Sequence, residues 1–426
     1  MRDNSIFVFI NFVLYLLAFF FILKKHKNSL LGKFIFLIYL ISSICSILEY
    51  KNPNSMIDYK NITFFPFLYL FICYIFISFP IVSFGNKQYT SIISPNINRL
   101  NFLIISLLLI IFLDFILSFS SLSGVITSLT NTDNFSYIYN DTINDNADKM
   151  TLGTNYLHII ASAFSDVLPF LFFYYLTLER KSKLILFFLL ISLLHPLINT
   201  ISYAGRNGLV VFILLLSSNY ILFKNLYTKL NKRIIIMIII FFGAFTVLTI
   251  MAITYARFST GMQDDNSAIE SVISYGGQSA LNFNEYIFNT KAYSYGDNSF
   301  PLIRMILGLD YSNNPIIRQE NWGYKMQIPV HIFYTLIGDL TLDFGPIITI
   351  LLIIILSTGI YRKTKKNIGG IKVYDIFLIY FWFNISAQAI FYFMNKTIGG
   401  NIKIAVFVLM YIFMKRILYS SNKGVL

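Results

Sequence analysis

The sequence predicts an all-α, polytopic membrane protein with about eleven transmembrane helices and a long structured insert on the outer side. Of its 426 residues, 56% are hydrophobic and only 12% are charged, whereas about a quarter of a soluble domain is charged. Apolar runs of about 17 residues or more recur along the chain, long enough to cross a hydrocarbon core about 30 Å thick. We therefore interpret 1–426 as a single integral membrane domain.

The apolar runs define the predicted spans in chain order. They are 5–23, 30–48, 62–84, 100–119, 155–177, 184–202, 207–223, 234–255, 344–361, 374–394 and 402–418. The formal net charge of +13 is explained by basic cytoplasmic loops such as KKHK, ERKSK and RKTKK, and it does not require nucleic acid as a partner. The same rule places the N-terminus outside and the C-terminus inside.

Two predicted outer segments are long, 120–154 and 256–343. The first is rich in Asn, Asp, Ser and Thr, which fits a flap, a sugar-binding wall or a solvated loop without a binding role. The second is expected to be folded. Ser267 and Glu270 form a capping-box pattern before one short helix, and Pro301 opens another. Its last part, 330–343, is either a re-entrant or interfacial helix or the start of span nine.

Ionisable residues within predicted spans are costly and usually face a cavity or a partner. The ionisable residues of this kind are Asp114, His158, Asp166, His195, Arg206, Asp339 and Asp343. His158 and Asp166 lie two helical turns apart, which suits either a buried polar pair or a helix-packing contact. His195 precedes Pro196 and is a candidate to satisfy backbone groups that the proline leaves free.

Arg206 is the strongest single signal for ligand binding. It lies between two glycines in SYAGRNGLVVF, near the predicted N-terminus of span seven. Helix amides and the helix dipole attract anions there, and the planar arginine fork can bind two oxygens of a diphosphate. The alternative is an interfacial anchor that reaches lipid phosphate.

Three further arginines lie on the same predicted outer side. They are Arg257, at the end of span eight, and Arg304 and Arg318 in the insert. Several arginines without an acidic, glycine-rich metal motif indicate phosphate binding that needs neither a metal nor another cofactor. Each arginine taken alone is also compatible with a surface salt bridge.

The segment HIFYTLIGDLTLDFG closes the insert and holds the candidate catalytic residues. His331 and Tyr334 share one helical face, as do Asp339 and Asp343. A histidine or a carboxylate here can act as the general base for a sugar hydroxyl. The alternative is a set of polar residues that cap an interfacial turn.

Two of these segments resemble Wzy-type oligosaccharide repeat-unit polymerases of O-antigen and capsule synthesis. YAGRNGLVVF resembles their small-residue–Gly–Ser/Arg–Gly segment, and TLIGDLTLDFGPIITIL resembles their G-D-x-x-x-D-F-G ending after a long outer loop. The order of spans and loops agrees along nearly the whole chain. Pro346 and Ile347 depart from the family pattern, in which a second glycine follows.

The resemblance implies an activity, a substrate and a location. The enzyme would be a metal-independent glycosyltransferase of GT-C-like architecture in the bacterial inner membrane, with its N-terminus periplasmic and its C-terminus cytoplasmic. It would join undecaprenyl-diphosphate-linked oligosaccharide units at the outer leaflet without a cofactor. Membrane lipid and a chain-length regulator protein are the other implied partners. Arginines would neutralise the diphosphate, and a base would take the acceptor proton.

Two alternatives stay open at this stage. An O-antigen ligase shares the spans, the long outer loop and the arginines, and only the D-F-G ending favours a polymerase. The second alternative is that the protein is not an enzyme but a lipid-linked oligosaccharide flippase or another transporter. Transporters often show repeated halves with broken helices, and no repeated halves are visible in this sequence.

Overall fold

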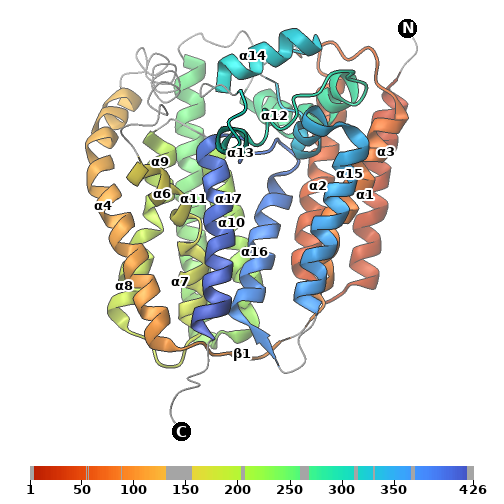
Figure 1. Ribbon diagram of the computed structural model, residues 1–426. Helices are drawn as coiled ribbons and strands as arrows, with labels where there is room; N and C mark the ends of the chain where they lie inside the picture. The colour runs from red at the N-terminus through yellow and green to blue at the C-terminus, as the bar shows by residue number, and fades with distance from the viewer. Residues whose placement is uncertain are drawn as a thin grey trace. The chain divides into compact units, whose positions relative to one another are not determined.

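The protein is helical almost throughout. The computed structural model describes residues 4–53, 55, 57–87, 89–130, 156–202, 207–259, 268–310, 315–329, 332–365 and 370–419. Within these ranges the only strands form one two-stranded pairing, and helices make up most of the rest (Figure 1). The predicted all-α class of a polytopic membrane protein is therefore confirmed.

Eight stretches of helix among the described residues are long and apolar enough to cross a membrane, and one bent pair brings the number to nine. The eight are α1 (Ser5–Lys25), α2 (Leu30–Tyr50), α3 (Phe64–Gly85), α4 (Ile97–Thr130), α8 (Lys183–Ser192) with α9 (Leu194–Ser202), α10 (Asn207–Phe223), α11 (Lys229–Ser259) and α15 (Thr335–Lys365). The bent pair is α6 (Tyr156–Ser165) with α7 (Leu168–Thr177).

The last two predicted spans correspond to shorter helices. They are α16 (Val373–Gln388) and α17 (Ile398–Phe413), each of 16 residues. A helix of 16 residues is about 24 Å long, which is less than the thickness of a typical hydrocarbon core. The total of eleven spans therefore stays a prediction.

The chain divides into two compact units, each assembled from stretches that are distant in sequence. Unit 1 comprises Met1–Gln88, Asp265–Lys366 and Trp382–Asn401. Unit 2 comprises Tyr89–Asp264, Asn367–Phe381 and Ile402–Leu426. The candidate insert belongs almost wholly to unit 1.

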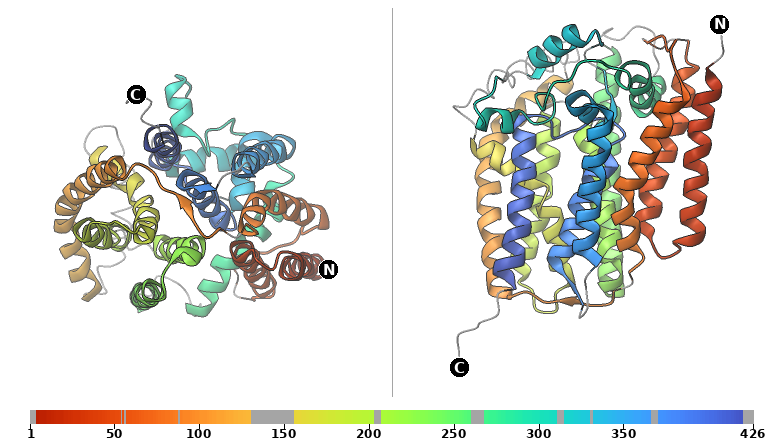
Figure 2. Two further views of the ribbon diagram at one scale, coloured as in Figure 1. Left: turned by 90° about the horizontal axis from the view of Figure 1, so that it is seen from below. Right: turned by 45° about the vertical axis from the view of Figure 1, so that its right-hand side comes forward.

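Small residues allow two helices of unit 1 to approach closely. The helices α1, α2 and α3, red to orange in Figure 2, lie side by side, and α12 (Ala268–Asn282) packs on α2. A Cβ atom added to Gly277 of α12 would lie 2.4 Å from the Cys45 carbonyl oxygen. The Ser46 hydroxyl instead donates a hydrogen bond to the Gly277 carbonyl oxygen (2.9 Å). Small residues and short polar contacts of this kind are typical of helix pairs inside membranes.

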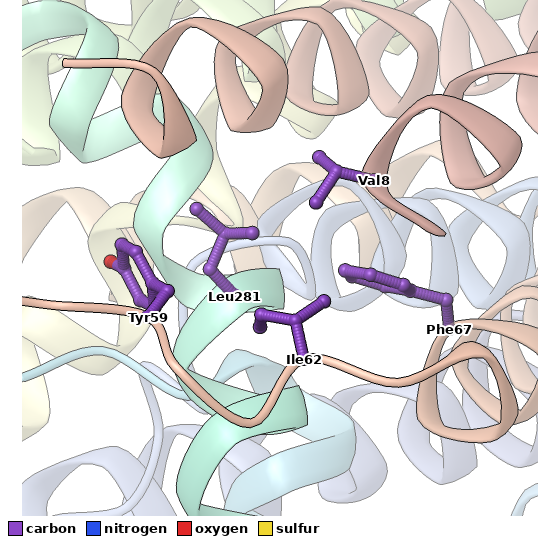
Figure 3. Packing of buried hydrophobic residues seen from close by; sticks show 5 residues of the cluster. All are labelled: Val8, Tyr59, Ile62, Phe67 and Leu281. Atoms are coloured by element: carbon purple, nitrogen blue, oxygen red, sulfur yellow. The ribbon is translucent and has the colours of Figure 1, made fainter. Parts of the chain in front are cut away.

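A hydrophobic cluster ties the insert to the N-terminal helices. Its buried members are Val8, Tyr59, Ile62, Phe67 and Leu281 (Figure 3). Leu281 lies on α12, whereas the other four come from α1, the α2–α3 connection and α3. The first helix of the insert therefore contributes to the core of unit 1.

The insert continues through short helical segments. After α12 come a π-helical turn, η3 (Phe283–Ile287), and then α13 (Pro301–Ile306) and α14 (Pro315–Met326). The short helices that the sequence predicts after Ser267 and from Pro301 are both observed.

A sharp break divides α15 after its first turns. Gly345 has φ 76° and ψ 166°, a backbone conformation that essentially only glycine adopts. Pro346 follows and lacks the amide hydrogen that would continue the ladder. Residues 335–344 thus form a short helix of their own. This arrangement agrees with the interpretation of 330–343 as a helix distinct from the span, for the part of that segment that is described.

Unit 2 has an aromatic core and the short sheet. Phe170 of α7 packs against Phe223, Phe377 and Tyr380, with ring centroids 5.0–5.4 Å apart. The sheet pairs β1 (Ile92–Ile93) in parallel with β2 (Ile371–Lys372). Two helical turns complete the unit, η2 (Lys224–Leu226) and η4 (Met414–Leu418).

Candidate functional site

Two carboxylates on the short helix of α15 organise the candidate site in unit 1. Asp339 and Asp343 are four residues apart and share a helical face, as their spacing predicts. Both side chains are completely buried. A buried carboxylate needs hydrogen-bond or charged partners to offset the loss of water, so the partners of each define its role.

Asp343 folds the loop between η3 and α13. Its carboxylate accepts hydrogen bonds from Ser294 Oγ (2.5 Å) and from the backbone amides of Gly296 (3.1 Å), Asn298 (3.0 Å) and Ser299 (2.9 Å). Gly296 has φ 86°, which allows the loop to curl around the carboxylate. These four donors occupy Asp343 so fully that it resembles a structural anchor more than a general base.

Asp339 joins three segments of unit 1. Its oxygens accept hydrogen bonds from the Phe393 amide (2.7 Å) and the Asn298 side-chain amide (2.9 Å), and Lys396 Nζ lies 3.3 Å away. The α15 helix is thereby fixed to the 294–299 loop and to the connection between α16 and α17. Asp339, like Asp343, is placed to position its neighbours.

Arg304 is neutralised inside the insert. Its guanidinium donates to the Asp310 carbonyl oxygen from Nε (2.9 Å) and Nη2 (2.6 Å), and to the Tyr295 carbonyl oxygen from Nη1 (3.1 Å). Its Nε also lies 3.5 Å from Asp297 Oδ1. The sequence-based alternative of a salt bridge therefore describes much of what Arg304 does.

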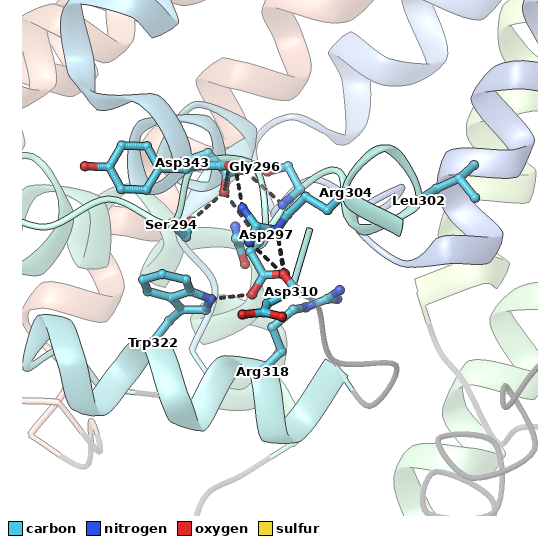
Figure 4. A network of polar contacts seen from close by, with 12 residues as sticks. Ser294, Gly296, Asp297, Leu302, Arg304, Asp310, Arg318, Trp322 and Asp343 are labelled. Carbon is cyan, nitrogen blue, oxygen red and sulfur yellow. Dashed lines mark hydrogen bonds and ion pairs between the residues drawn. The ribbon is translucent and has the colours of Figure 1, made fainter. Parts of the chain in front are cut away.

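The α14 helix is held against this loop by Trp322. The indole Nε1 donates a hydrogen bond of 2.6 Å to Asp297 Oδ2. Figure 4 shows Trp322 and Arg318 extending from α14 toward the loop that carries Asp297. Because the two residues are four positions apart, one face of α14 delivers both to the site.

Arg318 differs from Arg304 because no carboxylate among the described residues forms an ion pair with it. The residue is only 5% exposed. Nη2 donates a hydrogen bond to the Lys396 carbonyl oxygen (3.3 Å), and among the described residues Nε has no hydrogen-bond partner. No described carboxylate forms an ion pair with it, whereas Arg304 and Lys396 each have one.

The electrostatic surroundings of Arg318 show the same imbalance. Burial lowers the pKa of Arg318 below its usual value, while the more distant charges of Asp297 and Asp343 act in the opposite direction. An arginine nevertheless stays protonated at physiological pH. The described part of unit 1 therefore contains a buried positive charge with an unused donor, Arg318 Nε, an arrangement that suits an anionic ligand.

The remaining predicted site residues fall into two groups. Tyr334 is buried and donates its hydroxyl to the Pro329 carbonyl oxygen, so its hydroxyl has a structural partner. Arg206 and His331 lie outside the described residues, and Arg257 lies within α11 with its side chain outside the described part. The structure thus brings together Arg304, Arg318, Asp339 and Asp343.

Sequence reasoning missed Lys396 and Asp297. Lys396 lies in the short connection between the last two predicted spans, on the predicted outer side, where it is the only cation in NKTIGGN. A lone cation in a short outer connection is a signal that could have identified Lys396 as a candidate site residue. Asp297 stands in a polar stretch, YGDNS, and no sequence feature separates it from a solvated loop residue.

A second polar cluster is buried in unit 2. Asp114 is 2% exposed and His195 is 1% exposed. His195 Nε2 lies 2.7 Å from Asp114 Oδ2, and His158 Nδ1 lies 3.1 Å from both oxygens of the same carboxylate. Asp114 thus binds two histidines from two other helices, and neither partner was predicted.

Asp166 has partners of its own in unit 2. Its carboxylate lies 3.2 Å from Lys403 Nζ, and its backbone carbonyl oxygen accepts the Tyr380 hydroxyl (2.5 Å). His158 therefore has its ion-pair contact with Asp114, and Asp166 has its own with Lys403. The 42° bend between α6 and α7 falls just where Asp166 lies.

Comparison with known proteins adds no relative. The chain matches no protein-family model, no curated protein and no solved structure. Within the described residues, no group of three or more His, Cys, Asp or Glu side chains is arranged to hold a metal ion. The residues of the site are therefore the basis for inferring the function.

Proposed function

We propose that the protein polymerises undecaprenyl-diphosphate-linked oligosaccharide repeat units by glycosyl transfer at the outer leaflet of a bacterial inner membrane. The resemblance of 335–351 to the polymerase ending supports this proposal. So does the position of that segment beside a cluster of cations in unit 1.

The single observation that carries the proposal is the buried, unmatched charge of Arg318. Taking a guanidinium out of water without a counter-ion costs several kcal/mol, so this arrangement suits a protein that receives an anion from elsewhere. A diphosphate fits because its oxygens can accept two donors from one planar fork. Lys396 contacts Arg318 through its backbone carbonyl oxygen, and its ammonium group is paired with Asp339.

The proposed reaction exchanges one glycosidic bond for another. The bond between the anomeric carbon of the donor glycan and the diphosphate oxygen breaks, and undecaprenyl diphosphate leaves with the electron pair. The same carbon forms a bond to a hydroxyl oxygen on the non-reducing sugar of the acceptor unit. The hydroxyl proton passes to a base. Arg318 stabilises the charge that develops on the leaving diphosphate.

His331 is the candidate for the base. Asp339 and Asp343 are occupied by hydrogen-bond donors, so their proposed role is to hold the loop and Lys396 in place. Arg206 and Arg257 remain candidates for diphosphate binding from the sequence alone.

Glycan length in the source bacterium tests the proposal. Deletion of the gene and expression of Arg318→Ala should each leave single repeat units, because transfer fails while units are still delivered. Loss of one charge-stabilising donor in a dry site costs about 2.7–4 kcal/mol, or about 10²–10³-fold in rate. Arg318→Lys should be impaired as well, because lysine lacks the planar fork.

Lys291→Ala is the matched control, since Lys291 is an exposed cation of the same insert. It should give chains of normal length. In an O-antigen pathway, loss of all repeats from lipid A core in the deletion strain would reject a polymerase in favour of a ligase or a flippase. Long chains from well-expressed Arg318→Ala would reject the assigned role of Arg318.

A further inference from the structure

A concave surface of unit 1 borders α14, which contributes Glu320 and Tyr324 from a different helical face than Arg318. It is a cavity of about 800 Å³ that is open to solvent. Its walls are Tyr286 of η3, Glu320, Tyr324 and Lys325 of α14, and Gln327 in the turn that follows. The cavity combines two aromatic rings with a carboxylate, an ammonium group and an amide.

Helical spacing explains how α14 serves two sites. Arg318 and Trp322 are four residues apart and face the loop that carries Asp297 (Figure 4). Glu320 and Tyr324 are also four residues apart and line the cavity on the other face. Residues separated by four positions lie above one another on a helix, so the two pairs lie on different faces of α14. Lys325, which also lines the cavity, has its ammonium 4.7 Å from the centre of the Trp322 ring.

The exposure of Tyr324 is the first indication of a ligand. The residue is 88% exposed although it lines a concavity. An aromatic face that remains in water offers an apolar platform, and its hydroxyl offers a polar tip. Pyranose rings present apolar C–H faces with hydroxyls at their edges, and they are complementary to such a platform. The cavity size is in the usual range for small-ligand sites.

Backbone geometry is the second indication. Gln327 has φ 55°, in a region that side chains other than those of glycine, asparagine and aspartate seldom adopt. Tyr286, another lining residue, belongs to a π-helical turn. Both kinds of local irregularity are concentrated at functional sites, and here both place a side chain in the same cavity.

We propose that this cavity is a saccharide-binding subsite that receives sugar rings of the lipid-linked repeat unit. This inference rests on the proposed function and names where the glycan, rather than the diphosphate, is held. Tyr324 stacks on one sugar ring. Glu320 accepts hydrogen bonds from sugar hydroxyls, while Lys325 and the Gln327 amide donate to ring and hydroxyl oxygens.

The test uses a saccharide without a diphosphate. Repeat-unit oligosaccharide is released from the strain's own polysaccharide, labelled at its reducing end and titrated into the full-length protein in lipid nanodiscs. The wild type should bind it, and Tyr324→Ala should weaken binding about tenfold, the scale of one lost aromatic contact. Tyr324→Phe should stay within about twofold of the wild type, because the ring face is kept.

Controls separate this inference from the proposed function. Arg318→Ala should bind the oligosaccharide like the wild type, because the probe has no diphosphate. Binding by the wild type with loss in Tyr324→Ala supports the subsite, even if glycan-length experiments reject polymerisation. No binding by the wild type, or equal binding by the wild type and Tyr324→Ala, would overturn it. Tyr324 is so exposed that its substitution leaves the fold intact.

Discussion

The two clusters of buried carboxylates differ in the groups that offset the charge of the carboxylate. In unit 2, Asp114 is matched directly by two histidine rings, and the cluster includes no described cation without a partner. In unit 1, Asp343 is satisfied mainly by backbone amides. Those amides carry no net charge, so Arg318 is left buried without an ion pair among the described residues.

This difference separates a scaffold from a binding site. A cluster whose charged groups are paired with one another needs no additional ion, and it holds its helices in register. A cluster with a surplus charge keeps a desolvation cost until a counter-ion arrives. Natural proteins retain such costs mainly where function requires them. The comparison therefore supports the proposal that unit 1 binds the ligand and that the Asp114 cluster is structural.

The largest effect is expected from Asp343→Asn. An asparagine has only one acceptor oxygen for these four donors. Its NH₂ group replaces the other oxygen and cannot accept a hydrogen bond. Because hydrogen bonds to charged groups are worth about 1.5–3 kcal/mol each, the unfolding free energy should fall by at least about 3 kcal/mol. Thermal unfolding in detergent measures it. The control Asp310→Asn changes an exposed carboxylate and should be neutral; equal stability of both variants would remove Asp343 as the loop anchor.

A smaller effect is expected from Asp114→Asn. The amide can still accept from one histidine, so the expected loss is about 2 kcal/mol of stability. Lipid-diphosphate binding by the folded protein should be unchanged, because the cluster acts as scaffold. Measuring both quantities on the same preparation checks the comparison directly. Lost binding at unchanged stability would show that the Asp114 cluster is functional after all.

The smallest effect is expected from Gly345→Ala. Its φ of 76° is strained for alanine, and the added Cβ would lie 3.0 Å from the Tyr293 ring. The expected destabilisation is about 1–2 kcal/mol. Gly359→Ala is a matched control in the same helix, with no atom within 4 Å of its added Cβ, and it should be neutral or slightly stabilising. Equal melting temperatures of Gly345→Ala and Gly359→Ala would show that the break in α15 does not require glycine.

The sequence predicted the parts of the site that local spacing determines. Helical periodicity placed Asp339 and Asp343 on one face, and apolar runs located most of the observed long helices. Charge type and position also placed Arg304 and Arg318 in the insert. A structured insert followed from the Ser267 and Pro301 signals, and α12 and α13 are present there.

Long-range pairing could not be predicted in the same way. His158 and His195 are 44 and 81 positions from Asp114, and one sequence does not say which faces of distant helices meet. For the same reason, Arg304 and Arg318 looked equivalent. Only their surroundings distinguish Arg304, whose donors contact carbonyl groups and Asp297, from Arg318, whose Nε has no partner among the described residues.

Ligand-induced stabilisation of Arg318→Met tests the central claim most directly. Wild-type protein and the variant are melted in nanodiscs with and without undecaprenyl diphosphate. An unpaired buried charge carries a desolvation penalty of several kcal/mol that an apolar side chain does not, so the ligand-free variant should melt at the same temperature as the wild type or higher. Ligand at 100 times its Kd should stabilise the wild type by about 2.7 kcal/mol and leave Arg318→Met nearly unchanged. A ligand-free variant that is less stable, with the full ligand shift retained, would contradict the account.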